Sequence, residues 1–544
     1  MPEYDVKIHA IRATSSRPRR RSNGNAASVN KRQANICLIA VTFIWSFEVI
    51  IHSIIPEGVS PFATACVTSL IGAALLWAYF FRRIGIAIKK QRVLFIRRIV
   101  LLGVLNCLYN VLYLIGLEYF DVSIGAFTAS MTVVILPVML LLVKRTMKLR
   151  TWISAGCVFA GIVVAVIPNI GHEHLPGIII MVVGALVRAL FIVKLNDYAR
   201  VHDPVTLTTG FTAVSALASF IPWVIVEPTT FLALPYSPRL IASYFVFGYF
   251  IVAFAMVLNC YAQRRATAAQ ATIIYSTEII FTTIWAVFLP DSIIDPVDIS
   301  PSLIVGCALV VLGNCIEIIR RKPKPEDEAV TRQDDDIMIQ TSHPFAVILD
   351  KLQLPWARKA LVFIALICVY LVIAMPFTVL SVIPGFTDVR PVHMLYPVYG
   401  IFFGIPGCFA TAMGNLIMDI VTDSLRWSSI AGFIAAFLYP YMMYIFWTRL
   451  LKSPFNLRSL RRIAQFAVSI ILCAIIMVFI ITPAVGFHYG DVDLILFAVS
   501  VFGNCTLFPI FFATPFIILI QEELGFEPMS HESLEKESFL KRLS

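Results

Sequence analysis

The chain has 544 residues, of which 59% are hydrophobic and 14% charged, with a mean hydropathy of +0.84 and a formal net charge of +10. Soluble domains average about 45–50% apolar and about 25% charged residues, so this composition excludes an ordinary soluble protein. Apolar runs of about 20 residues recur along the chain, and each can cross roughly 30 Å of hydrocarbon as a helix. The predicted fold class is an all-α polytopic membrane protein.

The basic residues and the cysteines argue against several other classes of protein. Lys and Arg lie in short loops between apolar runs, which is typical of charges that set membrane topology and not of nucleic-acid binding. The eleven cysteines lie inside apolar runs without a C-x-x-C pair, so neither a disulfide framework nor a zinc site is indicated. No Walker loop or nucleophile elbow is present, and we predict no cofactor and no enzymatic activity.

The N-terminal part of the chain is predicted to hold ten spans. Residues 1–35 carry the cluster RPRRR without an apolar core, which predicts a cytoplasmic tail. The spans are expected at 36–55, 59–81, 99–117, 122–143, 152–168, 175–193, 205–226, 240–262, 269–289 and 301–319. Alternate loops carry 19 Lys or Arg, against the single Arg239 in the others. The positive-inside rule then places both ends of this ten-span segment in the cytoplasm.

The ten spans contain an internal repeat. Residues 111–142 resemble residues 257–289 at an offset of 146, and each segment is a span, a tight polar turn and a second span. Similarity between halves of opposite membrane orientation is typical of inverted-repeat transporters. We therefore predict a 5+5 inverted repeat with halves at about 36–168 and 175–320.

Three stretches resemble the drug/metabolite transporter superfamily in its ten-span, EamA-type form. They are IWSFEVIIHSIIPEGVSPFATACV in the first span, LLLVKRTMKLRTWISAGCVFAGIVVAV around the fifth and STEIIFTTIWAVFLPDSI in the ninth. The resemblance covers residues 36–320 and implies a secondary transporter that moves small metabolites, amino acids or drugs without ATP. The Glu-Pro pair of the family's ninth span is Glu278-Ile279 here.

Ionisable residues inside these spans are the first candidates for a site, because burying them unpaired costs several kcal/mol. Glu48 lies within the first span with His52 one turn further, Arg188 in the sixth and Glu278 in the ninth. We expect Glu48 or Glu278 to bind a proton or a cationic solute, with His52 tuning the charge and Tyr275 lining the cavity. The structural alternative is that Arg188 pairs with Glu278 or extends toward the near membrane surface.

A second group of spans follows a charged linker. Residues 321–355 include RRKPKPEDEAVTRQDDD, which lacks apolar periodicity and predicts a flexible cytoplasmic linker. Spans are then expected at 360–383, 394–404, 405–423, 429–448, 463–483 and 494–520, forming a six-span module over 356–522 with a cytoplasmic tail at 523–544. The short second and third spans should form a hairpin that turns at Ile405–Pro406–Gly407.

The six-span module resembles the substrate-binding membrane subunits of energy-coupling-factor vitamin transporters. The resemblance rests on RPVHMLYPVYGIFFGIPGCFATAMGNLIMDIVTD (390–423) and covers about 355–522. It implies a vitamin-type solute bound near the outer face and transfer through partner subunits that hydrolyse ATP.

Polar residues at helical spacing mark the candidate site of this module. Asn415, Asp419 and Asp423 recur every four residues and therefore share one face of a helix, with Arg390 predicted at the same outer end. We expect them to bind a small polar or cationic solute. The alternative is that Asp419 pairs with Arg390 and that Asp423 only ends the helix.

The sequence thus favours a secondary-active transporter of a small metabolite or drug-like solute, fused to a membrane solute-binding module. The expected partners are the lipid bilayer and the solute, with proton coupling, and a homodimer or energy-coupling subunits are further possibilities. The expected location is the plasma membrane, with both termini cytoplasmic. Two alternatives stay open: a capture subunit that works with a separate ATPase, and a membrane sensor that binds solute without moving it.

Overall fold

The structure, a computed structural model, describes residues 23–55, 59–90, 92–117, 131–142, 147–166, 175–229, 237–288, 300–318, 355–383, 386–451, 455–457, 459–490 and 492–523. The first 22 residues, nearly all of the linker and the C-terminal tail after Glu523 lie outside these ranges. Within them, 11 helices are long and apolar enough to cross a membrane, and three shorter apolar helices accompany them. The all-α polytopic fold class is therefore confirmed.

Residues 36–320, the N-terminal module, form two sets of helices in the order of the predicted repeat. The first set is α1 (Asn23–Trp45), α2 (Phe47–Ile54), α3 (Pro61–Lys90), α4 (Arg92–Leu117), α6 (Thr132–Leu142) and α7 (Leu149–Val166). The second set is α8 (Leu175–Ala199), α9 (Pro204–Val226), α11 (Pro238–Val246), the π-helix η3 (Phe247–Ala255), α12 (Met256–Gln263), α13 (Ala268–Tyr275), α14 (Glu278–Phe288) and α15 (Pro301–Ile318). The helix α1 begins at Asn23, so the last third of the predicted tail is helical, because ASVNKRQA lacks proline and is rich in good helix formers.

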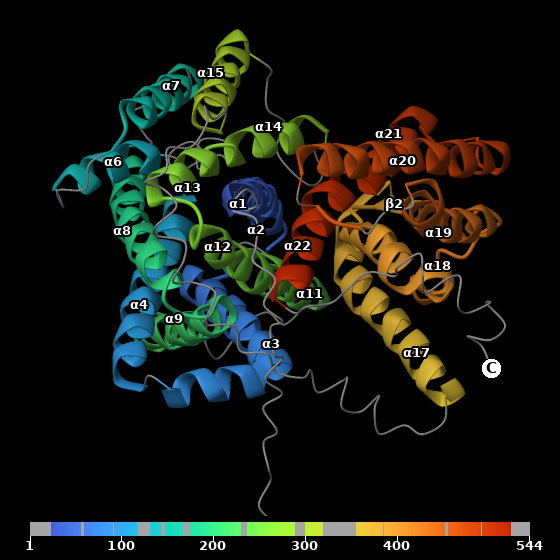
Figure 1. The fold of residues 1–544 in the computed structure, drawn as a ribbon, viewed down its shortest axis with the longest axis horizontal. Helices are drawn as coiled ribbons and strands as arrows, with labels where there is room; N and C mark the ends of the chain where they lie inside the picture. The colour runs from blue at the N-terminus through green and yellow to red at the C-terminus, as the bar shows by residue number, and fades with distance from the viewer. Residues whose placement is uncertain are drawn as a thin grey trace, which may run out of the picture.

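Helices that are equivalent in the two sets pack against each other. The second and seventh spans form the pair α3–α9, and the fifth and tenth form α7–α15. The third span packs on the sixth through α4 and α8, and the equivalent eighth span packs on the first through α12 and α1. Figure 1 shows α7 and α15 side by side, and α3 beside α9. This arrangement is the one that a 5+5 inverted repeat produces.

Small residues allow these equivalent helices to approach closely. A Cβ placed on Gly161 of α7 would lie 2.6 Å from the carbonyl oxygen of Gly306 on α15, whereas Gly156 on the same helix has nothing within 4 Å. The hydroxyl of Ser154 donates a hydrogen bond to the carbonyl of Gly313 on α15 at 2.5 Å. Close contact of backbones through small residues is how membrane helices associate without a hydrophobic driving force.

Residues 356–522, the C-terminal module, follow with a different arrangement. The elements are α17 (Pro355–Ala374), η7 (Met375–Val379), β1 (Ser381–Ile383), β2 (Thr387–Asp388), η8 (Pro391–Met394), α18 (Leu395–Val421), α19 (Ser428–Ile445), η9 (Phe446–Leu450), α20 (Leu460–His488), α21 (Leu494–Phe508), the π-helix η10 (Pro509–Ala513) and α22 (Thr514–Glu523). The antiparallel pair β1–β2 lies between the first two helices.

The chain reverses direction inside α18. Gly404 has φ 59° and ψ −137°, a conformation that no helix contains and that favours glycine. Gly407 lies against the backbone carbonyl of Tyr399, although residues eight apart in a straight helix are about 12 Å apart. The two arms of α18 therefore pack as a hairpin, and the turn predicted at Ile405–Gly407 falls at Gly404.

The two modules share one apolar core, through an aromatic seam. On the N-terminal side the seam is Phe43, Phe47, Phe250, Phe254, Phe281 and Trp285, and on the C-terminal side it is Phe377, Phe508, Phe511, Phe512 and Phe516. The rings of Phe43 and Phe511 stack with centroids 4.3 Å apart. In Figure 1 the red helix α22 lies between the two modules, and it packs on α1 and α12.

Candidate functional site

Two spans of the N-terminal module are interrupted, and each interruption places a glutamate at a helix start. The first span breaks at Ser46 between α1 and α2, and the ninth breaks at Ser276–Thr277 between α13 and α14. Glu48 lies in the first turn of α2, and Glu278 is the first residue of α14. A helix N-terminus carries a partial positive charge that stabilises a carboxylate there. Discontinuous helices of this kind form the sites of many secondary transporters.

The two interruptions are held together by hydroxyl groups. The hydroxyls of Thr42 and Thr277 lie 2.8 Å apart, and the indole N–H of Trp285 donates a hydrogen bond to Ser46 Oγ at 2.8 Å. The Ser46 hydroxyl also donates to the carbonyl of Phe43 at 2.6 Å, which offers the backbone a side-chain partner at the break. Both spans thus meet where their helices are interrupted.

Arg188 of α8 lies beside Glu278 in a cage of aromatic rings. Its guanidinium is 3.6 Å from Glu278 Oε2, and the two side chains are 9% and 8% exposed. The guanidinium carbon lies 5.2 Å from the ring centroid of Trp45, 5.0 Å from that of Tyr109 and 5.9 Å from that of Tyr275. Such contacts contribute about 0.5–2 kcal/mol each.

The structure brings together most of the residues predicted for this site. Glu48 is close enough to interact electrostatically with both Glu278 and Arg188. The pairing of Arg188 with Glu278 is the structural alternative stated from the sequence, whereas extension of Arg188 toward the membrane surface does not occur, because its side chain is buried. His52 lies in α2, but its side chain is outside the described residues.

A network of amides anchors Tyr275 and was not foreseen from the sequence. The Tyr275 hydroxyl donates a hydrogen bond to Asn259 Oδ1 and accepts one from Gln263 Nε2 at 2.8 Å. Asn196 donates to the carbonyls of Gln263 and Ala266, both at 2.9 Å. The available signal was three amides in otherwise apolar helices, since buried amides need hydrogen-bond partners.

The C-terminal module contains a cavity of about 500 Å³. Its polar side comes from the β1–β2 segment, from α18 and from the turn that leads into α19. Its apolar side comes from α20 and α21, through Met477, Ile481, Val485, Phe497 and Val501. Small-molecule sites typically enclose about 300–1,000 Å³, so the cavity has the size of a solute site.

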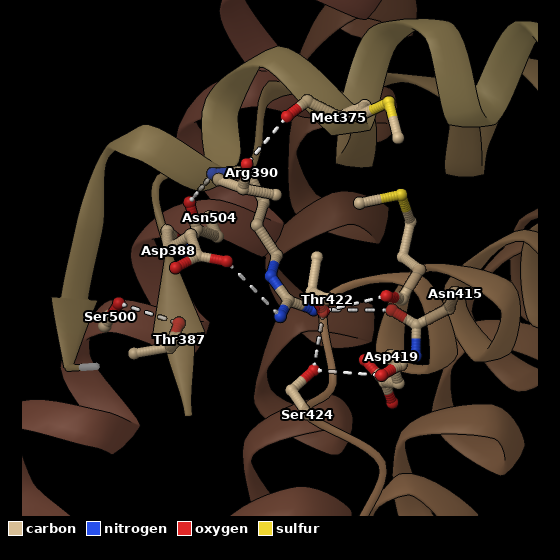
Figure 2. Close-up of polar contacts among 12 residues, drawn as sticks. Met375, Thr387, Asp388, Arg390, Asn415, Asp419, Thr422, Ser424, Ser500 and Asn504 are labelled. Carbon is tan, nitrogen blue, oxygen red and sulfur yellow. Dashed lines mark hydrogen bonds and ion pairs between the residues drawn. The ribbon is translucent and has the colours of Figure 1, made fainter. Parts of the chain in front are cut away.

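Arg390 organises the polar side of the cavity, as Figure 2 shows. Its guanidinium lies 3.8 Å from Asp388 Oδ2 and donates a hydrogen bond to Asn415 Oδ1 at 3.4 Å. Its backbone N–H donates to Asn504 Oδ1 at 2.8 Å, and Asn504 Nδ2 donates to the carbonyl of Asp388 at 2.8 Å. Burial lowers the pKa of Arg390, but the carboxylates of Asp388 and Asp419 outweigh burial and raise it above its ordinary value.

The three polar residues predicted to share one face of α18 do not all line the cavity. Asn415 and Asp419 are buried and line the cavity, and Asp419 is hydrogen-bonded to Ser429. Asp423 is exposed, has a positive φ of 53° in the turn after α18, and does not line the cavity. The helix ends before Asp423, which therefore leaves the face that Asn415 and Asp419 share. Arg390 forms its ion pair with Asp388, and not with Asp419 as the alternative stated from the sequence had it.

Three charged or amide residues that line the cavity, Asp388, Arg426 and Asn504, were not among the site candidates from the sequence. Arg426 also lines the cavity, with its guanidinium carbon 4.2 Å above the Phe386 ring and 5.3 Å from the Tyr489 ring. Within the described part of the chain, no group of three His, Cys, Asp or Glu side chains is placed to hold a metal ion.

The fold and the paired interruptions define a polytopic membrane protein with two repeated five-span halves. The model of the EamA-like transporter family matches residues 32–167 and again 175–316, together just over half of the chain. The chain belongs to the EamA-like transporter family. It is therefore a membrane transporter of small solutes, and the family is in general not enzymatic. The resemblance of the C-terminal module to vitamin-binding subunits is not confirmed by these comparisons.

Other comparisons add little to the family assignment. No curated protein matches the chain significantly. Fourteen chains of solved structures match, and one of them, titled "Crystal structure of protein", is 20% identical and covers 52% of this chain and 97% of its own length, with a TM-score of 0.43.

Proposed function

We propose that the protein is a secondary-active transporter of a small metabolite or drug-like solute, with its transport site at Arg188, Glu278 and Glu48. The observation that carries this proposal is the meeting of two interrupted spans, each with a glutamate at a helix start, around one buried arginine. Ionisable groups are expensive inside a membrane and are therefore the first candidates for a transport pathway.

The charges of this cluster suggest how solute movement is coupled to protons. With both glutamates ionised, Glu48, Glu278 and Arg188 sum to one negative charge. Binding of a proton or of a cationic solute neutralises that charge, which lowers the cost of moving the site through the low-dielectric interior. Alternating access then follows from rocking of the two five-span halves around the site.

The C-terminal module supplies, in this proposal, a solute cavity that belongs to the same transporter. Its elements η10 and α22 pack on α1, and α22 also packs on α12, so that the aromatic seam joins them to the N-terminal module. This supports a module that acts with its own chain more than a subunit that captures vitamins for a separate ATPase. We place both termini in the cytoplasm and the protein in the plasma membrane, as the loop charges favour.

Flux in proteoliposomes tests the proposal. The purified full-length protein is reconstituted without nucleotide, and an imposed proton gradient is combined with a panel of metabolites and cationic drugs, with internal pH as the readout. We expect solute-dependent proton movement that Glu278→Gln reduces at least tenfold. Asp423→Asn, which changes an exposed carboxylate outside both sites, is the matched control. Flux that needs a copurifying ATPase would favour the capture subunit, and solute binding without flux would favour the sensor.

A further inference from the structure

The charges that line the C-terminal cavity are balanced, and two of them, Asp419 and Arg426, form no close ion pair, although Asp419 interacts electrostatically with Arg390. Asp388, Arg390, Asp419 and Arg426 contribute two negative and two positive charges. Asp388 and Arg390 pair with each other at 3.8 Å. In the described ranges, neither Asp419 nor Arg426 has an oppositely charged side chain within ion-pair distance.

Asp419 and Arg426 are nevertheless held in place. Asp419 is 9% exposed, and Ser429 donates a hydrogen bond to its carboxylate. Arg426 lies over the faces of Phe386 and Tyr489, and these contacts fix its side chain without neutralising its charge. A preorganised carboxylate and a preorganised guanidinium therefore line the same cavity.

The summed charge of the cavity and its apolar wall limit the kind of ligand that fits. An anionic or cationic solute would bring an unbalanced charge into a cavity whose own charges sum to zero, and burying such a charge is costly. A solute without charge would leave Asp419 and Arg426 desolvated and unpaired. The wall of Met477, Ile481 and Val485 offers apolar contact to the body of the solute.

We propose that this cavity binds a zwitterionic solute with an apolar body, of the size of an amino acid or a dipeptide. Its ammonium group pairs with Asp419, its carboxylate pairs with Arg426, and its apolar body packs on α20 and α21. This inference rests on the proposed function of the C-terminal module as a solute cavity, and it names the chemical class of that solute.

A matched series of probes tests the charge requirement on the full-length protein in detergent. L-tryptophan and glycyl-L-tryptophan are zwitterions with different charge separations, whereas tryptamine keeps only the ammonium and indole-3-propionate only the carboxylate. We expect titration calorimetry to show that at least one zwitterion binds at least tenfold more tightly than both singly charged analogues. Binding of either analogue within tenfold of the tighter zwitterion overturns the proposal. So does the absence of zwitterion binding at about 10 mM, a concentration at which even millimolar affinity would be seen.

Two substitutions test whether Asp419 pairs with the ammonium group of the solute and Arg426 with its carboxylate. Asp419→Asn should weaken zwitterion binding at least tenfold without weakening that of indole-3-propionate, whereas Arg426→Gln should weaken zwitterion binding similarly without weakening that of tryptamine. Asp423→Asn and Arg461→Gln, which alter exposed charges that do not line the cavity, should have no effect on zwitterion binding. Loss of zwitterion binding in these controls contradicts the assignment.

The two proposals fail in different ways. Zwitterion binding without Glu278-dependent flux would remove the transport mechanism and keep the cavity assignment. Glu278-dependent flux without any zwitterion preference would keep the transporter and remove the ligand class.

Discussion

Replacing Arg188 by methionine should destabilise the protein more than replacing Glu278 by glutamine. Arg188→Met leaves the buried carboxylate of Glu278 and the half-buried carboxylate of Glu48 near each other without the guanidinium, and removes three cation–π contacts. Breaking a buried ion pair costs about 3–5 kcal/mol, and the cation–π contacts add about 0.5–2 kcal/mol each. The carboxylates can take up protons, which limits the loss, so we expect about 3–5 kcal/mol in total.

Glu278→Gln should lower the free energy of unfolding by less than Arg188→Met does, because the remaining partners of Arg188 stay in place. Glu48 still lies within electrostatic reach, the three rings still surround the guanidinium, and glutamine keeps a carbonyl acceptor at the same position. We expect a loss of about 1–3 kcal/mol, as for a weakened hydrogen bond to a buried charged group. The double variant should be less destabilised than the sum of the two single variants, by about 0.5–3 kcal/mol.

Equilibrium unfolding by sodium dodecyl sulfate in dodecylmaltoside micelles measures these differences. The wild type, the two single variants and the double variant are titrated at one pH. Asp423→Asn serves as the control for a lost exposed carboxylate. Equal losses in the two single variants, or additive losses in the double variant, would show that the aromatic cage and the second glutamate do not contribute as the geometry implies.

Three further predictions concern packing and use the same unfolding assay. Gly161→Ala should cost about 1–3 kcal/mol, because its Cβ meets a backbone carbonyl of α15, whereas Gly156→Ala on the same helix should be neutral. Gly404→Ala should cost about 1–3 kcal/mol through strain at φ 59°. Phe43→Ala should cost about 3–5 kcal/mol by opening the aromatic seam, whereas Phe479→Ala, 73% exposed toward lipid, should stay within about 0.5 kcal/mol of the wild type. Equal effects within either pair would contradict the packing described.

Hydrophobicity was sufficient to predict that the chain forms many apolar helices, because a run of apolar residues must become a helix in lipid. The two repeated halves were predicted from the internal repeat at an offset of 146 residues. The interruption at Ser46 was not foreseen, because neither proline nor glycine marks it and its hydroxyl hydrogen bonds depend on α14, 239 residues away along the chain.

Residues of both candidate sites were predicted from the sequence, but most of their partners were not, because partners depend on contacts between distant segments. Glu48, Glu278, Asn415 and Asp419 stand out because polar groups in apolar runs need partners. Which distant partner each takes is a matter of tertiary geometry: Arg390 meets Asn504 because α21 packs on β2 and η8, and Arg426 lines the cavity because α18 ends at Val421.

The aromatic seam has a consequence for synthesis of the chain. Phe43 leaves the ribosome 468 residues (511 − 43) before its stacked partner Phe511. At about 5–20 residues per second, roughly 25–90 s separate the two events. During that interval the N-terminal halves can assemble, but the face of α1 that η10 and α22 will cover lies open to lipid or to other chains. The surroundings of α1 are therefore completed only after η10 and α22 have been synthesised, and a ribosome that stalls before them releases a protein in which α1 lacks these two neighbours.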